Sequence, residues 1–189
     1  MEPYSVDKNF EGQKFEGDQL NEIEFEDCVF NSCHFANLSL KKTKFIHCEF
    51  HSCDFSNSML NEVSLQGVEF EDSKLIGIDF SHCNTFLLEM EFVQSALDYA
   101  IFSGLSLPNT SFNHCRLVDA TFADCDLTDS LFDGCNLAGA QFEQNILTGA
   151  DFREAVGFVI DPSDNNLKKA KFSVEGLKGL VMKFDLIIE

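Results

Sequence analysis

The sequence predicts an all-β solenoid, in which short straight segments coil so that each turn stacks on the one before it. Three observations support this prediction. Phe or Leu occupies every fifth position over most of the chain, small or apolar residues stand two positions before each of them, and the remaining positions are mostly polar. A period of five fits neither an α-helix, with about 3.6 residues per turn, nor a long flat strand, whose side chains alternate with a period of two.

The five-residue spacing runs through two segments of the chain. It extends from Phe10 to Phe80 and resumes, two residues out of frame, from Leu87 to Phe152. All 29 of these positions are Phe or Leu, and they hold 17 of the 21 phenylalanines, which chance does not produce. We call each such position a centre. Together the centres predict one continuous apolar core.

Each five-residue unit has a simple physical reading. The residue two before the centre, such as Cys28 or Ala120, is small or apolar, whereas the residue between them is mostly polar. Three extended residues therefore alternate in, out and in. The two residues after the centre are rich in Gly, Asn, Asp and Ser, which favour turns. The chain thus turns a corner every five residues.

This pattern resembles the pentapeptide-repeat family, whose units consist of a small residue, a polar residue, Leu or Phe, and two polar residues. The segments "ADFRE", "CDLTD", "CNLAG" and "AQFEQ" match it closely, and the resemblance covers about residues 8–154. It implies a right-handed quadrilateral β-helix with four sides, each formed by one five-residue unit. The period of five comes from the sequence, and the four sides come from the resemblance.

The cysteines at first suggest a metal site, because "FIHCEFHSCDF" holds His47, Cys48, His51 and Cys53. Seven of the eight cysteines, however, stand two positions before a centre, and Cys83 does so in the first frame, where the centre would be Thr85. At such positions a free thiol behaves as a small apolar side chain. The two histidines fall at turn positions and do not converge with the cysteines, as zinc ligands must. We predict core thiols, with no metal and no cofactor.

Disulfides are the alternative for these cysteines. In the implied coil, cysteines separated by one full turn stack about 4.8 Å apart, a distance that a disulfide tolerates. These pairs are Cys28 with Cys48, Cys33 with Cys53, and Cys115 with Cys135. The chain opens without a signal peptide and has no apolar run long enough to span a bilayer, so a cytoplasmic location is expected. That setting favours thiols.

The spacing divides the chain into three parts. Residues 1–9 are expected to lead into the coil, residues 10–154 form the β-helix with a frame slip at 81–87, and residues 155–189 form a C-terminal cap and dimerisation module. In the last part Ser173 is a candidate N-cap for a short helix. An apolar helix face and an apolar tail follow, and we expect them to bind a second copy of the chain: Leu177, Leu180, Val181, Phe184, Leu186, Ile187 and Ile188.

This order of parts is similar to the Qnr-type and microcin-immunity branch of the family. That resemblance implies an acidic rod that dimerises through its C-terminal module, binds a type II topoisomerase, chiefly DNA gyrase, and protects it from poisons such as fluoroquinolones. The sequence differs from some Qnr proteins in having no long loop insertions in the β-helix.

The charge balance agrees with a basic protein partner. With 13 Lys and Arg against 32 Asp and Glu, the net charge is −19, which disfavours binding to nucleic acid or anionic membranes. When successive centres are assigned in turn to the four sides of the implied coil, the acidic residues concentrate along one edge of the rod. We expect these carboxylates to form a surface that mimics DNA: Glu49, Glu69, Glu71, Asp72, Glu91, Asp126, Asp129, Asp133 and Asp151.

Two other functions remain open at this point. The chain could be a structural or regulatory rod with a partner other than a topoisomerase, and its acidity could simply keep it soluble. Catalysis is not expected, because the five histidines fall at outward or turn positions and no nucleophile–base pair is evident.

Overall fold

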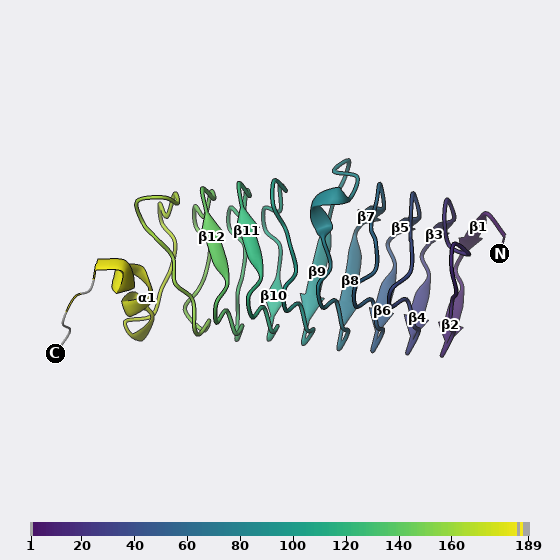
Figure 1. The fold of residues 1–189 in the computed structure, drawn as a ribbon, viewed down its shortest axis with the longest axis horizontal. Coiled ribbons are helices and arrows are strands. Elements are labelled where there is room, and N and C mark those ends of the chain that lie inside the picture. The colour runs from purple at the N-terminus through teal and green to yellow at the C-terminus, as the bar shows by residue number, and fades with distance from the viewer. Residues whose placement is uncertain (1, 185, 187–189) are drawn as a thin grey trace.

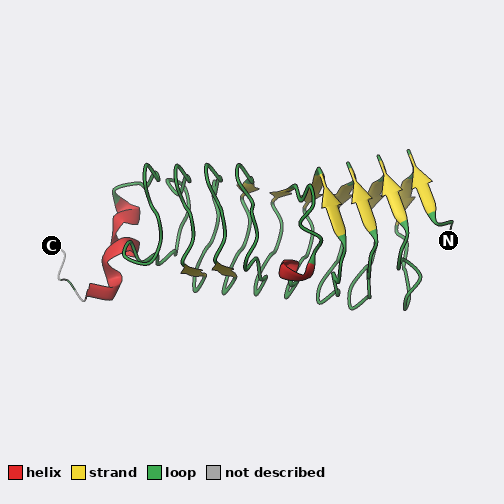
Figure 2. Ribbon diagram, turned by 90° about the horizontal axis from the view of Figure 1, so that it is seen from above, coloured by secondary structure: helices red, strands yellow, loops and turns green. Residues whose placement is uncertain are grey.

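The coiled chain forms a rod with its two ends far apart (Figures 1 and 2). The structure is a computed structural model that describes residues 2–184 and 186. Along the rod each coil lies beside the next, and the C-terminal helical segment lies across the far end (Figure 1).

Backbone pairing confirms the predicted coil and its four sides. Phe10 pairs with Phe30 on a parallel segment, which is the fourth centre after it. Within one coil the pairing recurs at every unit, at 24 with 44, 29 with 49, 34 with 54, and 39 with 59. Four successive pairings thus complete one coil and correspond to the four sides of the quadrilateral β-helix. The fold predicted from the repeat is confirmed.

The regular strands are short, because each side of a coil holds only about three extended residues. They are β1 (Tyr4–Val6), β2 (Asn9–Glu11), β3 (Glu24–Glu26), β4 (Val29–Asn31), β5 (Lys44–Ile46), β6 (Glu49–His51), β7 (Ser64–Gln66), β8 (Val68–Glu71), β9 (Met90–Val93), β10 (Phe112–Asn113), β11 (Thr121–Ala123) and β12 (Gln141–Glu143). One sheet has the order β1-β3-β5-β7, a second β10-β9-β8-β6-β4-β2, and β11 pairs with β12. Isolated parallel bridges continue the ladders between them.

The corners explain the polar residues that follow each centre. At most centres the second residue that follows has a positive φ, as at Asp27 (51°), Asn37 (60°) and Gly67 (61°). Glycine adopts this left-handed conformation without strain, and Asn and Asp tolerate it better than most residues. Each five-residue unit therefore needs one residue that tolerates a positive φ, and this explains why Gly, Asn and Asp recur at the corners.

Phenylalanine rings form a column along one side of the core. Nine of them, one in each coil, stack on their neighbours with ring centroids 4.6 to 5.5 Å apart. The column comprises Phe10, Phe30, Phe50, Phe70, Phe92, Phe112, Phe132, Phe152 and Phe172. It lies behind the six-stranded sheet, so the core supports the outward residues of those strands.

The cysteines belong to the core, and all eight are buried free thiols. Several donate to backbone carbonyls of the preceding coil, as Cys53 Sγ does to the Phe30 oxygen at 3.2 Å. Burial raises the pKa of Cys48 and of Cys53 to about 12. These thiols are therefore protonated at neutral pH and serve as packing residues.

The frame slip is a local enlargement of one coil. Asn84 pairs with Ser64 in the regular register, whereas Met90 pairs with Val68, where the regular register would place position 88. The coil therefore accommodates two additional residues between positions 84 and 90. The expectation that Leu87 is a core centre is wrong, since its side chain is 63% exposed. Leu87 instead has a φ of 54° and occupies a corner of the first frame.

The backbone continues to coil beyond residue 154, where the regular Phe and Leu spacing ends. Lys171 pairs with Asp151, and Phe172 stacks on Phe152 at 5.4 Å. Buried asparagines in successive coils connect this region, because Asn145 donates from its backbone and its side chain to Asn165 Oδ1 at 3.0 and 3.1 Å.

A short helical segment covers the last coil. It consists of η2 (Glu175–Leu177), α1 (Lys178–Val181) and η3 (Met182–Phe184), and the earlier 3-10 turn η1 (Phe80–His82) lies in the enlarged coil. The hydroxyl of Ser173 accepts a hydrogen bond from Gly176 N at 3.1 Å, as expected of a cap.

Two glycines let the helical segment approach the coil closely. A Cβ atom on Gly179 would lie 2.3 Å from the backbone oxygen of Phe158, and one on Gly176 would lie 3.0 Å from the Phe158 ring. Gly179 O accepts a hydrogen bond from Ile160 N at 3.1 Å. Leu180 packs against the core beside them. The segment therefore closes the apolar end of the coil.

Candidate interaction surface

Three glutamates form a column on the outer side of the six-stranded sheet. Glu49 on β6, Glu69 on β8 and Glu91 on β9 are direct backbone partners in the parallel ladder. Adjacent strands lie about 4.8 Å apart, so carboxylates of like charge lie one above another. Such an arrangement is unfavourable in isolation. It concentrates negative charge on one side of the rod.

The central glutamate shows the effect of this crowding. Desolvation is the largest cause that raises the pKa of Glu69, and the charges of Glu49, Glu91 and Glu71 raise it further. A cation brought to this surface would relieve the repulsion. The repulsion among these carboxylates therefore favours the binding of basic groups at the column.

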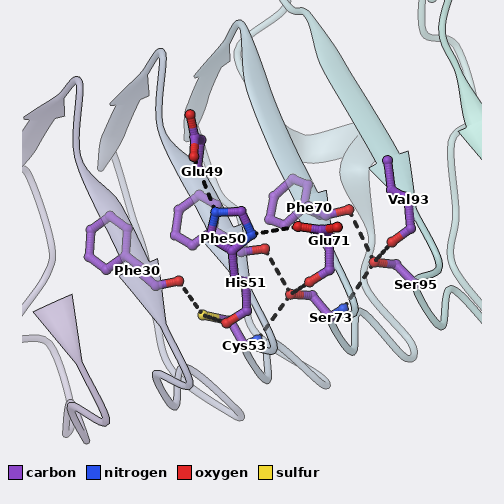
Figure 3. Close-up of polar contacts among 10 residues, drawn as sticks. All are labelled: Phe30, Glu49, Phe50, His51, Cys53, Phe70, Glu71, Ser73, Val93 and Ser95. Carbon is purple, nitrogen blue, oxygen red and sulfur yellow. Dashed lines mark hydrogen bonds and ion pairs between the residues drawn. The ribbon is translucent and has the colours of Figure 1, made fainter. Parts of the chain in front are cut away.

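One histidine bridges two of the carboxylates (Figure 3). His51 Nδ1 lies 2.8 Å from Glu71, and its Nε2 lies 3.1 Å from Glu49. Desolvation lowers the pKa of His51, but the two carboxylates outweigh it, so the pKa is raised from 6.5. Sequence reasoning did not include His51 in this surface. A signal was present, because His51 and Glu71 are direct partners in neighbouring coils and so share one side of the rod.

A hydrogen-bonded ladder beneath the surface holds these strands in place (Figure 3). Ser73 Oγ accepts from Cys53 N at 3.0 Å and donates to the Phe50 oxygen at 3.1 Å. Ser95 Oγ repeats the arrangement one coil later, accepting from Ser73 N at 3.0 Å. The carboxylates thus project from a rigid support.

The enlarged coil extends this surface toward its corner. A hollow there is lined by Gly67, Val68, Glu69, Glu89 and Glu91. We call Glu49, Glu69, Glu71, Glu89 and Glu91 the acidic face. Asp72 follows Glu71 at an exposed corner.

The other expected acids lie apart from the acidic face. Asp126 belongs to a different side of the rod, Asp129 lies two coils beyond Glu89, and Asp133 lies two coils beyond Glu91. Asp151 lies further still and is ion-paired with Arg153 at 2.7 Å. The hydrogen bond from that guanidinium lowers the pKa of Asp151. The structure therefore brings four of the nine expected residues together in the acidic face, with Asp72 beside them, and leaves the other four elsewhere along the rod.

The C-terminal segment presents a second, apolar surface. Leu177, Phe184 and Leu186 are exposed, whereas Leu180 and Val181 are partly buried. Ile187 and Ile188 lie outside the described residues. Val174 and Met182, which sequence reasoning missed, are also exposed. Val174 could have been found by the same spacing, because it stands three residues before Leu177, whereas Met182 lies off the expected helix face.

Within residues 2–184 and position 186, no group of three or more His, Cys, Asp or Glu side chains could hold a metal ion. The helices in that part of the chain are all too short or too polar to cross a membrane.

Comparison with known proteins identifies the family. A family model described as pentapeptide repeat region matches residues 7–80, 23–102, 79–152 and 95–179. No curated protein matches the sequence.

Solved structures share the fold at low sequence identity. One trypsin-treated variant of QnrB1, a plasmid-mediated fluoroquinolone resistance protein, is 18% identical with a TM-score of 0.65, covering 98% of this chain and 100% of QnrB1. A second such variant is 20% identical with a TM-score of 0.61, covering 97% and 99%. HetL, a protein involved in heterocyst differentiation regulation from the cyanobacterium Nostoc sp. strain PCC 7120, is 14% identical with a TM-score of 0.53, covering 92% and 85%. With family matches that span most of its length, this chain belongs to the pentapeptide-repeat family.

Proposed function

We propose that this protein binds DNA gyrase, a type II topoisomerase, by presenting the acidic face in place of DNA, and that it protects the enzyme from poisons such as fluoroquinolones. The observation that carries the proposal is the column of Glu49, Glu69 and Glu91, repeated at the spacing of the coils. A linear array of negative charge is what a DNA-binding groove recognises through the phosphate backbone.

The distribution of charge supports this proposal. Residues 75–152 contain eleven Asp and Glu residues and one basic residue, Arg116. The repeats from Phe10 to Phe152 span seven coil-to-coil spacings, about 35 Å, which corresponds to a stretch of duplex with about 20 phosphate charges. The net charge of −19 is similar. The fold is shared with QnrB1, a fluoroquinolone resistance protein, and this shared fold agrees with the proposed function.

We further propose that the protein is a homodimer in the cytoplasm, joined through the C-terminal segment. Exposed apolar side chains on and after the helical segment, among them Leu177 and Phe184, support a partner at that end of the rod. A dimer through this end would double the length of the acidic rod.

A gyrase supercoiling assay with a fluoroquinolone tests the proposal. Titrating the purified protein should restore supercoiling at low concentration and inhibit it at higher concentration, because the protein competes with DNA. An absence of both effects would overturn the proposal and favour a rod that binds a different protein.

A charge-reversal variant tests whether the acidic face is the surface that binds gyrase. Replacing Glu69, Glu71 and Asp72 by Lys should abolish gyrase binding and leave the dimer intact. The matched control replaces three exposed corner acids on another side, Glu22, Glu62 and Asp124, by Lys. Both variants change the net charge equally, so equal loss of binding would show that only the total charge matters.

A further inference from the structure

The enlarged coil exposes two large apolar side chains beside the acidic face. Phe86 is 67% exposed and Leu87 is 63% exposed. Of the 21 phenylalanines in the sequence, most lie in the core, and only Phe184 in the C-terminal segment is comparably exposed among the described residues. In Figure 1 the coil that contains η1 reaches beyond its neighbours. The extra residues therefore carry apolar groups outward.

Hydrogen bonds define the shape of this projection. Phe86 N donates to Asn84 Oδ1 at 3.0 Å, and Asn84 Nδ2 donates to Ser64 Oγ at 3.2 Å in the preceding coil. Gln66 Nε2 lies 3.5 Å from the Phe86 oxygen. The loop is thus tied to two residues of β7, Ser64 and Gln66. A pre-shaped loop loses little conformational freedom when it binds a partner.

The projection and the acidic face form one surface. A hollow beneath the loop is lined by Leu87, Leu88, Glu89 and Glu91, and by the turn Leu107–Thr110 of the next coil. Glu89 and Glu91 also line the hollow that contains Glu69. Apolar contacts and negative charge are therefore available to the same partner at the same time.

We propose that the loop at Phe86 and Leu87 is an apolar anchor that inserts into an apolar pocket at the edge of a basic, DNA-binding protein surface. This inference rests on the proposed function and adds the source of its specificity. Phosphate-like charge alone binds any basic groove, because such attraction depends little on sequence or shape. DNA offers no side chain like Phe86 on its outer surface, so the anchor distinguishes one basic protein from another.

The chemistry of the partner follows from this arrangement. Charge complementarity requires Lys or Arg side chains opposite Glu69, Glu89 and Glu91. The pocket must be apolar and must lie next to those basic groups. Apolar burial changes little with salt, whereas the ionic contacts weaken steeply as salt rises. Salt dependence can therefore separate the two contributions.

The test measures binding of the full-length protein to purified DNA gyrase over a range of salt concentrations. The variant combines Phe86→Ser with Leu87→Asn, because Asn suits the positive φ at position 87. Losing these apolar contacts should weaken binding by about 10- to 100-fold at every salt concentration, with an unchanged slope of log Kd against log salt. The melting temperature should stay the same, because both side chains are exposed.

Tyr99→Asn is the matched control. Tyr99 is 59% exposed and has a φ of 60°, so it is also a large exposed side chain at a left-handed corner, but on a different side of the rod. Its replacement should leave gyrase affinity unchanged.

Three outcomes would count against the anchor. If wild-type protein and the double variant bind gyrase equally, the anchor is overturned and the proposed function stands. The variant could instead bind more weakly and also show a shallower slope of log Kd against log salt. In that case the loop acts through the neighbouring charges, and the anchor is also overturned. If wild-type protein does not bind gyrase, the proposed function fails and the anchor fails with it.

Discussion

His51 Nδ1 lies 2.8 Å from a carboxylate oxygen of Glu71, one coil further along the rod. The other ring nitrogen lies 3.1 Å from Glu49. A neutral imidazole has only one N–H donor, so a ring that faces two carboxylates favours the doubly protonated form. The structure therefore places a histidine whose protonated form can donate to two carboxylates within the acidic face.

The bridge predicts a stability that depends on pH. The pKa of His51 in the folded protein is raised from 6.5, so its contribution is fully present below that value and is lost as pH rises through the raised pKa. We expect His51→Gln to lower the melting temperature most near pH 6, and less and less as pH rises further above 6.5. Thermal unfolding over this range measures the effect. His34→Gln on another side is the control, and an equal pH trend in both variants would contradict the bridge.

The phenylalanine column predicts a large penalty for shortening one of its members. Phe112 is fully buried between Phe92 and Phe132, with ring centroids 5.2 and 5.0 Å away. Phe112→Ala should reduce the free energy of unfolding by about 3–5 kcal/mol, because it leaves a cavity between two rings. Urea denaturation measures this. Phe86→Ala should change it by less than about 0.5 kcal/mol, and similar losses in the two variants would refute a core confined to the centres.

The helical cap predicts sensitivity at a glycine. A Cβ at Gly179 would lie 2.3 Å from the Phe158 backbone oxygen, so Gly179→Ala must push the segment away from the last coil. We expect a stability loss of about 1–3 kcal/mol and faster trypsin cleavage within residues 175–184. The neighbouring exposed Lys178→Ala should have little effect on stability. Full retention of stability and protease resistance in the Gly179 variant would show that the cap packs differently.

The exposed apolar surface of the C-terminal segment predicts the oligomeric state. Replacing Leu177 and Phe184 by Glu should convert the proposed dimer to a monomer, because charges would be buried in an apolar contact. Sedimentation velocity measures the mass. The control adds charge elsewhere, with Leu131→Glu at an exposed position on the rod. A wild-type protein that sediments as a monomer would overturn the dimer itself.

Much of the fold follows from local chemistry in the sequence. The five-residue period, the buried cysteines and the left-handed corners all arise from which side chains avoid water and which residues tolerate a positive φ. Ser173 could be recognised as a cap for the same reason, since the cap acts on a backbone group only three positions away.

The position of the slip and the end of the coil are harder to predict. A Phe or Leu at five-residue spacing looks the same at a centre and at a corner, so spacing alone assigns the exposed Leu87 to the core. Phe172 keeps the frame of Phe152, but Gly157 and Pro162 interrupt the pattern between them. Only backbone pairing distinguishes these cases, because it depends on contacts between successive coils.

The sequence by itself determined that this protein is a solenoid with an apolar core and an acidic exterior, because the repeat directs each side chain inward or outward. The tertiary structure decided which outward residues meet. It brought His51 to Glu71, stacked Glu49 on Glu69, and placed Glu89 beside the projecting loop. The physical reason is that the coil length and the two-residue enlargement set the register between distant segments, and register alone determines which charges share a surface.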